Sequence, residues 1–177
     1  MSGPAVSRPL SHWASRIRLI TASSRSLWLL KMKTPPTANI KLRETEGQRE
    51  VYDIVRDRYV ALTPEEWVRQ HCIHYLHYHL GYPLELMQVE GAITLNGMTR
   101  RCDIVVYDSQ VRPFIIVECK RENIPLTQKV LDQASRYNLV LHVPYLCLTN
   151  GPEQLCCQVD FDRKRVVPIP ELPSFHK

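Results

Sequence analysis

Three charged side chains, Asp103, Glu118 and Lys120, interrupt a stretch that is otherwise rich in β-branched residues. Apolar runs on both sides of a short polar segment, 108–113, predict a β-hairpin with largely buried strands. Because side chains alternate across a strand, Glu118 and Lys120 should share one face and Cys119 should lie on the other. Asp103, at the start of the first strand, meets them if the strands pair in the register that the turn suggests. Two carboxylates and an ammonium at one sheet edge can hold a hard divalent cation beside a nucleophilic water. The alternative is a surface hairpin with a solvated ion pair, since short motifs also arise by chance.

A first helix is expected to begin after Thr63 and to run to about Leu80. Thr63 is the expected N-cap, Pro64 occupies the first helical position, and Glu66 completes a capping box. Gly81 marks the end of the helix. Four histidines lie on this segment, but no acid accompanies them, so a solvated or hydrogen-bonded face is favoured over a metal site: His71, His74, His77 and His79.

A second helix is expected to begin after Thr127 and to run to about His142, directly after the strand that carries Glu-x-Lys. Gln133 and Tyr137 are four residues apart and therefore share one face of it. By themselves these two residues fit an ordinary amphipathic helix, with a packed tyrosine and a solvated glutamine. After an Asp…Glu-x-Lys hairpin, a shared role at the same site is favoured.

The remaining pattern predicts strands at 87–95, 98–107, 113–120, 145–149 and 155–161, with one more at 165–169. Asn96-Gly97 is expected to form a tight hairpin turn. Residues 33–58 are expected to be irregular at first and then to carry a short helical pattern that includes Val51 and Ile54. A helix followed by three strands, a second helix and further strands predicts an α/β sandwich with a mixed sheet flanked by helices.

The charge distribution separates the first 31 residues from the rest of the 177-residue chain. Residues 1–31 contain five basic residues and no acid, which accounts for the whole net charge of +5. This composition is typical of a mitochondrial-type presequence, but we favour a true start at Met32; in either case we expect residues 1–31 to be an extension outside the fold. The predicted domain is 32–170, and 171–177 is expected to be a loose tail. Because the body is neutral, a nucleic-acid site must be a local patch, for which five basic residues are available: Arg100, Arg101, Lys120, Arg121 and Lys129.

The six cysteines lie mostly in apolar segments and form no Cys-x2-Cys pair, which favours buried free thiols in a reducing cytoplasm. No apolar run approaches the roughly 20 residues that cross a bilayer, so no membrane association is expected. The chain also lacks the Gly-x4-Gly-Lys-Ser/Thr loop of an ATP-driven motor.

The Asp-x14-Glu-x-Lys hairpin resembles the catalytic signature of the PD-(D/E)xK nuclease superfamily, and Gln133-x3-Tyr137 resembles the additional motif of RecB-type nucleases. Together with the segments 59–70 and 143–151, these motifs resemble the N-terminal domain of the type I restriction enzyme R protein (HsdR), over about residues 33–165. One departure is that Cys102 replaces the proline that names the superfamily.

The resemblance implies a restriction-endonuclease-like fold with a Mg²⁺ or Mn²⁺ site. Asp103 and Glu118 would be the metal ligands, helped by the backbone carbonyl of Cys119, and Lys120 would position or activate a water. A further carboxylate is implied on the first helix, and its spacing from Arg69 places that role on Glu65. Two more site residues are implied on the second helix, Gln133 and Tyr137.

The implied function is a stand-alone, metal-dependent deoxyribonuclease, related to restriction or DNA repair. DNA is the implied partner, and a homodimer or a partner subunit is compatible with the sequence. The alternative is a non-catalytic DNA-binding or partner-binding module that retains the nuclease fold. A purely structural protein is disfavoured, because a second motif follows the first in the expected order.

Overall fold

The computed structural model describes residues 30–31, 39–95, 98–163 and 165–176. The predicted turn at Asn96-Gly97, the proposed start at Met32 and residues 1–29 lie outside these ranges. Of the N-terminal extension, only Leu30–Lys31 is described, and it forms a short strand, β1, that pairs with Gln154 and Glu153. These two residues therefore belong to the sheet, although we expected the whole extension to lie outside the fold.

The main sheet is mixed, as predicted, with the strand order β1-β9-β8-β7-β6-β5 and with β10 paired to β9. Its one parallel pair joins β7 to β8, and all its other described pairs are antiparallel. The strands are close to the predicted ranges: β5 Met87–Leu95, β6 Met98–Tyr107, β7 Pro113–Cys119, β8 Tyr145–Thr149, β9 Glu153–Asp160 and β10 Arg165–Ile169.

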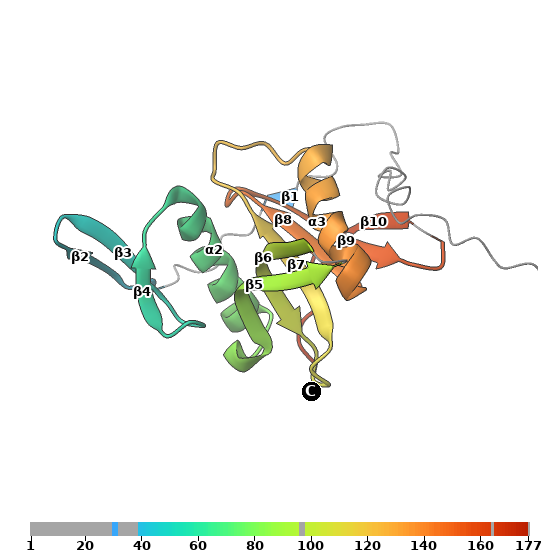
Figure 1. Cartoon of the computed structure of the whole chain (residues 1–177), viewed down its shortest axis with the longest axis horizontal. Helices are drawn as coiled ribbons and strands as arrows, with labels where there is room; N and C mark the ends of the chain where they lie inside the picture. Colours follow the sequence, from blue (N-terminus) through green and yellow to red (C-terminus); the bar gives the residue numbers. More distant parts are fainter. Residues whose placement is uncertain (1–29, 32–38, 96–97, 164, 177) are drawn as a thin grey trace, which may run out of the picture.

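One long helix packs against each face of this sheet (Figure 1). α2 (Pro64–His74) continues into a π-helical turn, η1 (Tyr75–His79), and packs on a core that includes Ile104 and Val117. A short 3-10 helix, η2 (Leu84–Leu86), leads into β5. α3 (Gln128–Leu141) packs on the opposite face with the core that includes Ile116. The alternation along β6 and β7 supplies both cores, because successive apolar side chains face opposite helices. None of the described helices is long and apolar enough to cross a membrane.

The start of α2 has half of the predicted capping box. The Thr63 hydroxyl accepts a hydrogen bond from the Glu66 N–H at 3.0 Å, as expected of an N-cap. The Glu66 side chain does not return to the cap. It contacts Arg56 and Arg69 instead, because a buried carboxylate needs cationic partners more than the cap needs a second bond. The helical segment ends as predicted, with Gly81 at φ +80°.

Residues 39–41, the first described part of the segment 33–58, have no regular secondary structure, as predicted, but the helical pattern predicted after them was wrong, since the chain forms strands there. β2 (Leu42–Thr45), β3 (Gln48–Asp53) and β4 (Arg58–Ala61) form a separate antiparallel sheet, called here the small sheet. The chain turns at Glu46 and Gly47, both with positive φ, which is the conformation of a tight hairpin turn. Val51 pairs with Val60 across the strands, so its burial follows the two-residue period of a strand.

The C-terminal segment 171–177, predicted to be loose, packs against the domain over its described part. Leu172 is 3% exposed and belongs to the core under α2. The N–H of Phe175 donates to the carbonyl of Leu80 at 2.7 Å, and its ring packs on Tyr82 at 5.4 Å between centroids. The three prolines of residues 168–177 suggested a loose tail, but the apolar side chains of 171–176 cover the end of the first helical segment.

We expect Leu172→Ala to lower the free energy of unfolding by about 2–5 kcal/mol, because it empties a buried site. Leu42→Ala is the matched control, since Leu42 is 44% exposed. Urea titration of both variants measures the difference. Equal stabilities would show that the segment is not part of the folded core.

Candidate active site

The end of β7 places Glu118 and Lys120 together on the face of the sheet that carries α3. Glu118 is 3% exposed. One of its oxygens, Oε1, accepts hydrogen bonds from Lys120 Nζ at 2.6 Å and from Gln133 Nε2 of α3 at 2.5 Å. Cys119 faces the other core, as the alternation of the strand predicts. The structure therefore brings three of the predicted site residues into direct contact.

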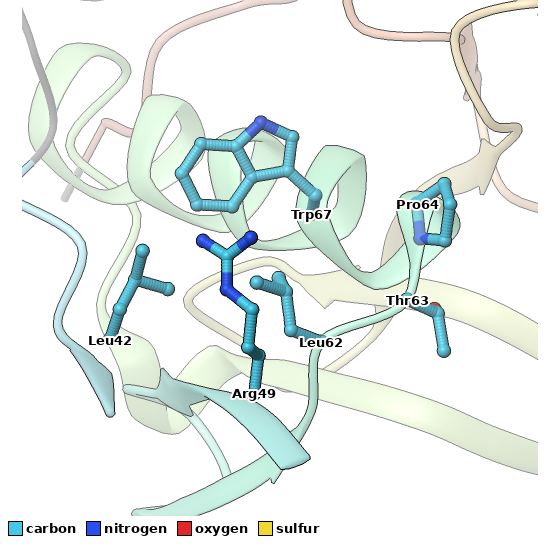
Figure 2. Close-up of a pocket in the computed structure, with 6 residues that line it drawn as sticks. All are labelled: Leu42, Arg49, Leu62, Thr63, Pro64 and Trp67. Carbon is cyan, nitrogen blue, oxygen red and sulfur yellow. The ribbon is translucent and has the colours of Figure 1, made fainter. Parts of the chain in front are cut away.

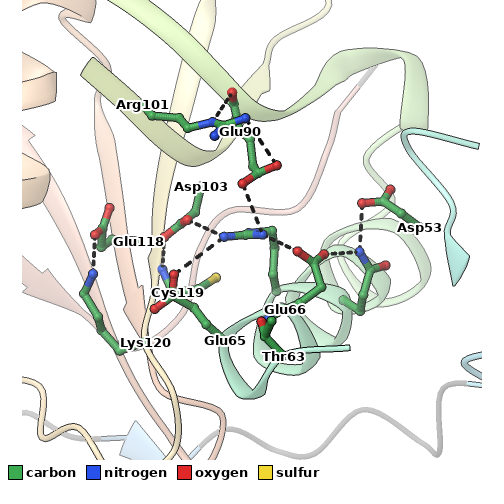
Figure 3. Close-up of polar contacts among 12 residues, drawn as sticks. Asp53, Thr63, Glu65, Glu66, Glu90, Arg101, Asp103, Glu118, Cys119 and Lys120 are labelled. Atoms are coloured by element: carbon green, nitrogen blue, oxygen red, sulfur yellow. Dashed lines mark hydrogen bonds and ion pairs between the residues drawn. The ribbon is translucent and has the colours of Figure 1, made fainter. Parts of the chain in front are cut away.

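Asp103 lies beside them but is held from the side of α2. Its Oδ2 accepts the backbone N–H of Cys119 at 2.7 Å, and its Oδ1 accepts a hydrogen bond from Arg69 Nη2 at 2.7 Å. The Asp103 side chain is 14% exposed. In Figure 3, Asp103 lies between the Glu118–Lys120 pair on one side and α2 on the other. Both of its oxygens are therefore fixed by the protein, which leaves their remaining lone pairs for a further ligand.

A local distortion of the sheet accompanies the position of Asp103. The regular register of β5 and β6 has no described pair at Glu90 and Asp103, although the pairs on both sides of this position are in register. Glu90 has a φ of 53°, which is uncommon for a residue other than glycine and costs on the order of 1–3 kcal/mol. The side chain of Glu90 reaches Arg56 at 2.7 Å.

Glu65, the carboxylate predicted on the first helix, points toward the same place. Figure 3 shows its side chain extending from the first turn of α2 toward Cys119. Its Oε1 lies 3.7 Å from Arg69 Nη2, and the side chain is 43% exposed. Its charge acts on both Glu118 and Lys120. Of the two site residues predicted on the second helix, Gln133 contacts Glu118 as described above. The side chain of Tyr137 lies outside the described part of the structure.

The electrostatics of the site oppose full ionisation of Glu118. Burial and the nearby charge of Asp103 raise the pKa of Glu118 to about 7, against the lowering effect of Lys120. Burial alone would lower the pKa of Lys120, but its hydrogen bond to Glu118 and the charge of Glu118 raise it above its usual value. Lys120 therefore stays an ammonium at neutral pH, while Glu118 sits near its titration point.

Two arginines, the buried Arg69 and the half-buried Arg56, organise the acids behind this site, although the sequence did not mark them as site residues. Arg69 pairs with Asp103 and with Glu66, and its side chain is 6% exposed. Arg56, from the turn between β3 and β4, donates to Glu66 at 2.7 Å and to Glu90 at 2.7 Å. Its Nε also donates to Asp53 of β3 at 2.6 Å. The amide of Gln70, on α2, donates to both Asp53 and Glu66 and so joins the same cluster.

A sequence signal existed for Arg69 but not for Arg56. Arg69 lies three residues after Glu66 and four after Glu65, the spacings at which helix side chains meet. Arg56 comes from a region whose secondary structure was predicted wrongly, so nothing in its local sequence placed it near α2.

The carboxylates at this edge of the sheet can supply a hard cation with only a small number of protein ligands. Within the described residues, no group of three or more His, Cys, Asp or Glu side chains is placed to hold a metal ion. Mg²⁺, however, is commonly held by one or two carboxylates and keeps several waters. The carboxylates of Asp103 and Glu118 fit that requirement in ligand chemistry and in number.

We expect Glu118→Gln to stabilise the fold increasingly as the pH rises. The folded state raises the pKa of Glu118 from 4.5 to about 7, so the folded protein retains a proton that the unfolded chain has lost between these values. Stability from this group is therefore greatest at low pH and falls as the pH rises through 7. From pH 5 to pH 8 the variant should gain about 2–3 kcal/mol relative to the parent. Urea titration at the two pH values measures this gap, and Glu122→Gln, at an exposed side chain, is the control. A gap that does not widen would show that Glu118 is readily ionised.

We expect Arg69→Met to cost about 3–5 kcal/mol of stability, because it leaves the largely buried carboxylate of Asp103 without its cation and the buried carboxylate of Glu66 with Arg56 alone. Arg43→Met removes an arginine from an exposed pair with Glu50 and should cost no more than about 1 kcal/mol. Chemical unfolding at pH 7.5 compares the two. Similar losses would show that the pair with Arg69 is not a structural constraint.

Comparison with known proteins places these residues in a family. The sequence model described as "Type I restriction enzyme R protein N terminus (HSDR_N)" matches residues 64–173. No curated protein matches the chain. Among solved structures, a fragment assigned to the HsdR subunit of a type I restriction enzyme from Vibrio vulnificus YJ016 is 24% identical, with a TM-score of 0.35. That alignment covers 50% of this chain and 16% of the other chain.

The matched residues begin at the first turn of α2 and end in the packed C-terminal segment, so they include Glu65, Asp103, Glu118 and Lys120 but not the small sheet. Since this match extends over more than half of the sequence, the chain belongs to the family of type I restriction enzyme R protein N-terminal domains.

Proposed function

We propose that this chain is a metal-dependent deoxyribonuclease that hydrolyses phosphodiester bonds with the PD-(D/E)xK arrangement. The observation that carries the proposal is the contact of Glu118 with both Lys120 and Gln133, beside an Asp103 that is hydrogen-bonded to the same strand. Membership of the R protein N-terminal family supports it, since the family name denotes a restriction enzyme. The mixed sheet between α2 and α3 is compatible with the sandwich fold of that superfamily.

Asp103 and Glu118, with the backbone carbonyl of Cys119, would hold Mg²⁺ or Mn²⁺. A bound ion would lower the pKa of a coordinated water and neutralise charge on the phosphate. Asp103 contributes a fixed ligand, because Arg69 and the N–H of Cys119 already orient its two oxygens. Glu118 contributes a carboxylate whose ionised form a cation would favour, since its pKa lies near 7.

Lys120 is the residue placed to handle the attacking water and the developing charge. Its raised pKa keeps Nζ protonated at neutral pH, so it can donate hydrogen bonds to a water or to a phosphate oxygen. Gln133 holds Glu118 from α3 and thereby fixes the acceptor that orients Lys120. Glu65 reaches the same edge and can accept a hydrogen bond from the water. We assign Tyr137 a supporting role on the same helix as Gln133.

DNA is the proposed substrate. Exposed basic residues lie on or directly after the three elements that carry Asp103, Glu118 and Gln133: Arg101 of β6, Arg121 after β7 and Lys129 of α3. A phosphate backbone is held by such charges without being read in sequence.

A non-catalytic DNA-binding or partner-binding module is the second candidate, and one observation favours it. Each carboxylate of the proposed metal pair already has a protein cation, Arg69 on Asp103 and Lys120 on Glu118. A site neutralised in this way is stable without a metal, as a module that has lost catalysis requires.

We expect Asp103→Asn and Lys120→Ala to separate metal binding from chemistry. Asp103→Asn removes a ligand charge and should lose both Mn²⁺ binding and cleavage. Lys120→Ala removes a repelling ammonium, so Mn²⁺ affinity should stay equal or rise. Cleavage by Lys120→Ala should nevertheless fall at least ~10²-fold, as expected for a positioned acid–base group. Calorimetric titration with Mn²⁺ and cleavage of supercoiled plasmid, linear duplex and single-stranded DNA provide the measurements.

Lys41→Ala, which removes a lysine preceding the small sheet, is the control for loss of a positive charge. If Lys120→Ala cuts DNA as fast as the parent, the lysine has no catalytic role. If the parent binds no Mn²⁺ and cuts none of the three substrates, the binding-module alternative replaces the nuclease.

A further inference from the structure

A second feature that could bind a ligand lies where the small sheet meets α2. It is a pocket of about 340 Å³, a volume within the range of small-molecule sites, ~300–1,000 Å³. Figure 2 shows the side chains that line it, which come from β2, β3, the segment after β4 and the first turn of α2: Leu42, Arg49, Leu62, Thr63, Pro64 and Trp67.

The indole of Trp67 forms an exposed aromatic wall of this pocket. Trp67 is 38% exposed, although it lies on a helix that buries most of its other side chains. The ring of His71, one turn further along α2, packs edge-on against it at 4.4 Å between centroids, which holds the indole in one orientation. Leu42, 44% exposed, lies on the opposite side of the pocket in Figure 2. The walls are thus a fixed aromatic face and aliphatic side chains.

Arg49 supplies the one charge among the residues that line the pocket. Figure 2 shows its guanidinium directed toward Trp67. Within the described residues, Arg49 takes part in no ion pair, whereas Arg43 and Arg56 of the same region are both paired with acids. The hydroxyl of Thr63 accepts the cap hydrogen bond from Glu66 and keeps its O–H as a neutral donor at the pocket.

We propose that this pocket binds one unpaired nucleotide of a DNA strand, with the base stacked on Trp67 and the phosphate on Arg49. A flat aromatic wall is complementary to a planar group, and an exposed guanidinium that forms no ion pair among the described residues is available to an anion. A nucleotide combines both in one unit, while an aliphatic peptide side chain would leave Arg49 without a partner. Base–aromatic stacking tolerates any base, which suits a pocket that has few hydrogen-bonding groups. The choice of DNA rests on the proposed nuclease function.

The base must be unpaired because a base within a duplex is stacked on its neighbours and cannot enter a side pocket. Trp67 lies two residues after Glu65 on α2, which places the two side chains on roughly opposite sides of the helix and about 3 Å apart along its axis. A strand that bends around the N-terminus of α2 can therefore reach both the pocket and the candidate active site. The preferred substrate is then DNA with a single-stranded segment or a frayed end.

Binding of a fluorescein-labelled oligothymidylate of twelve nucleotides, followed by anisotropy in EDTA, tests the proposal without cleavage. Trp67→Leu should bind about 5- to 150-fold more weakly than the parent, the range measured for loss of one stacked base. Trp67→Phe keeps an aromatic face and should recover most of the affinity. Arg49→Gln should bind more weakly and show a smaller dependence on salt. Two matched controls should bind as the parent does: Tyr78→Leu, at an aromatic residue 70% exposed elsewhere, and Arg163→Gln, at a side chain 71% exposed.

Thermal unfolding of each variant separates loss of binding from loss of fold, and Trp67→Phe keeps the test decisive if Trp67→Leu unfolds. Equal affinity of Trp67→Leu and the parent would overturn the proposal. It would also be overturned if sedimentation showed the parent to be a dimer and Trp67→Leu a monomer, because a second copy would then fill the pocket. Plasmid cleavage in Mn²⁺, measured in parallel, distinguishes the two ideas. Cleavage without an effect of Trp67→Leu on binding refutes only the pocket, whereas Trp67-dependent binding without any cleavage supports the pocket and refutes only the nuclease.

Discussion

The position of α2 on the sheet depends on one buried ion pair, between Arg69 and Asp103. Arg69 is 5% exposed, and its guanidinium bridges the carboxylate of Glu66 on α2 to that of Asp103 on β6. Burying these charges singly would cost several kcal/mol each, and only their mutual attraction and hydrogen bonds offset that cost. The pair therefore acts as a constraint on geometry: any shift of α2 along the sheet would leave at least one charge buried and unpaired. Apolar packing under α2 tolerates small displacements far better, since it has no directional requirement.

The same constraint separates the two carboxylates of the candidate site into different roles. Asp103 is held at both oxygens, by Arg69 and by the N–H of Cys119, so its orientation is fixed before any ligand binds. Glu118 has a cation in Lys120 at 2.6 Å, but burial and the charge of Asp103 outweigh it and raise the pKa of Glu118 to about 7. One acid is thus pre-organised and the other is destabilised in its charged form. A site of this kind gives up stability in the free protein in a way that a bound cation would restore, which is typical of functional rather than structural acids.

The parts of the fold that the sequence predicted well are those specified by local patterns. Thr63 caps α2 because its hydroxyl satisfies an N–H three residues away, and Glu118 and Lys120 share a face because strands alternate. The errors arise where distant contacts decide the outcome. Val51 and Ile54 have a spacing compatible with a helix, yet cross-strand pairing and the turn at Glu46-Gly47 place Val51 in a strand. Arg56 has one local partner, Asp53, three residues earlier, but its other two carboxylate partners come from α2 and β5, which no local pattern indicates.

Arg56 also shows why the small sheet belongs to the working unit, although the family match begins only at Pro64. Two of its carboxylate partners, Glu66 and Glu90, lie inside the matched region, and Glu66 in turn holds Arg69. Without Arg56, Arg69 would have to balance Glu66 and Asp103 alone and would share Glu90 only with the exposed Arg101. The excess negative charge would weaken the grip on Asp103 and pull Arg69 toward Glu90, from which it lies only 3.8 Å. The matched region of this chain therefore depends, for the geometry of its candidate site, on a cation supplied from outside that region.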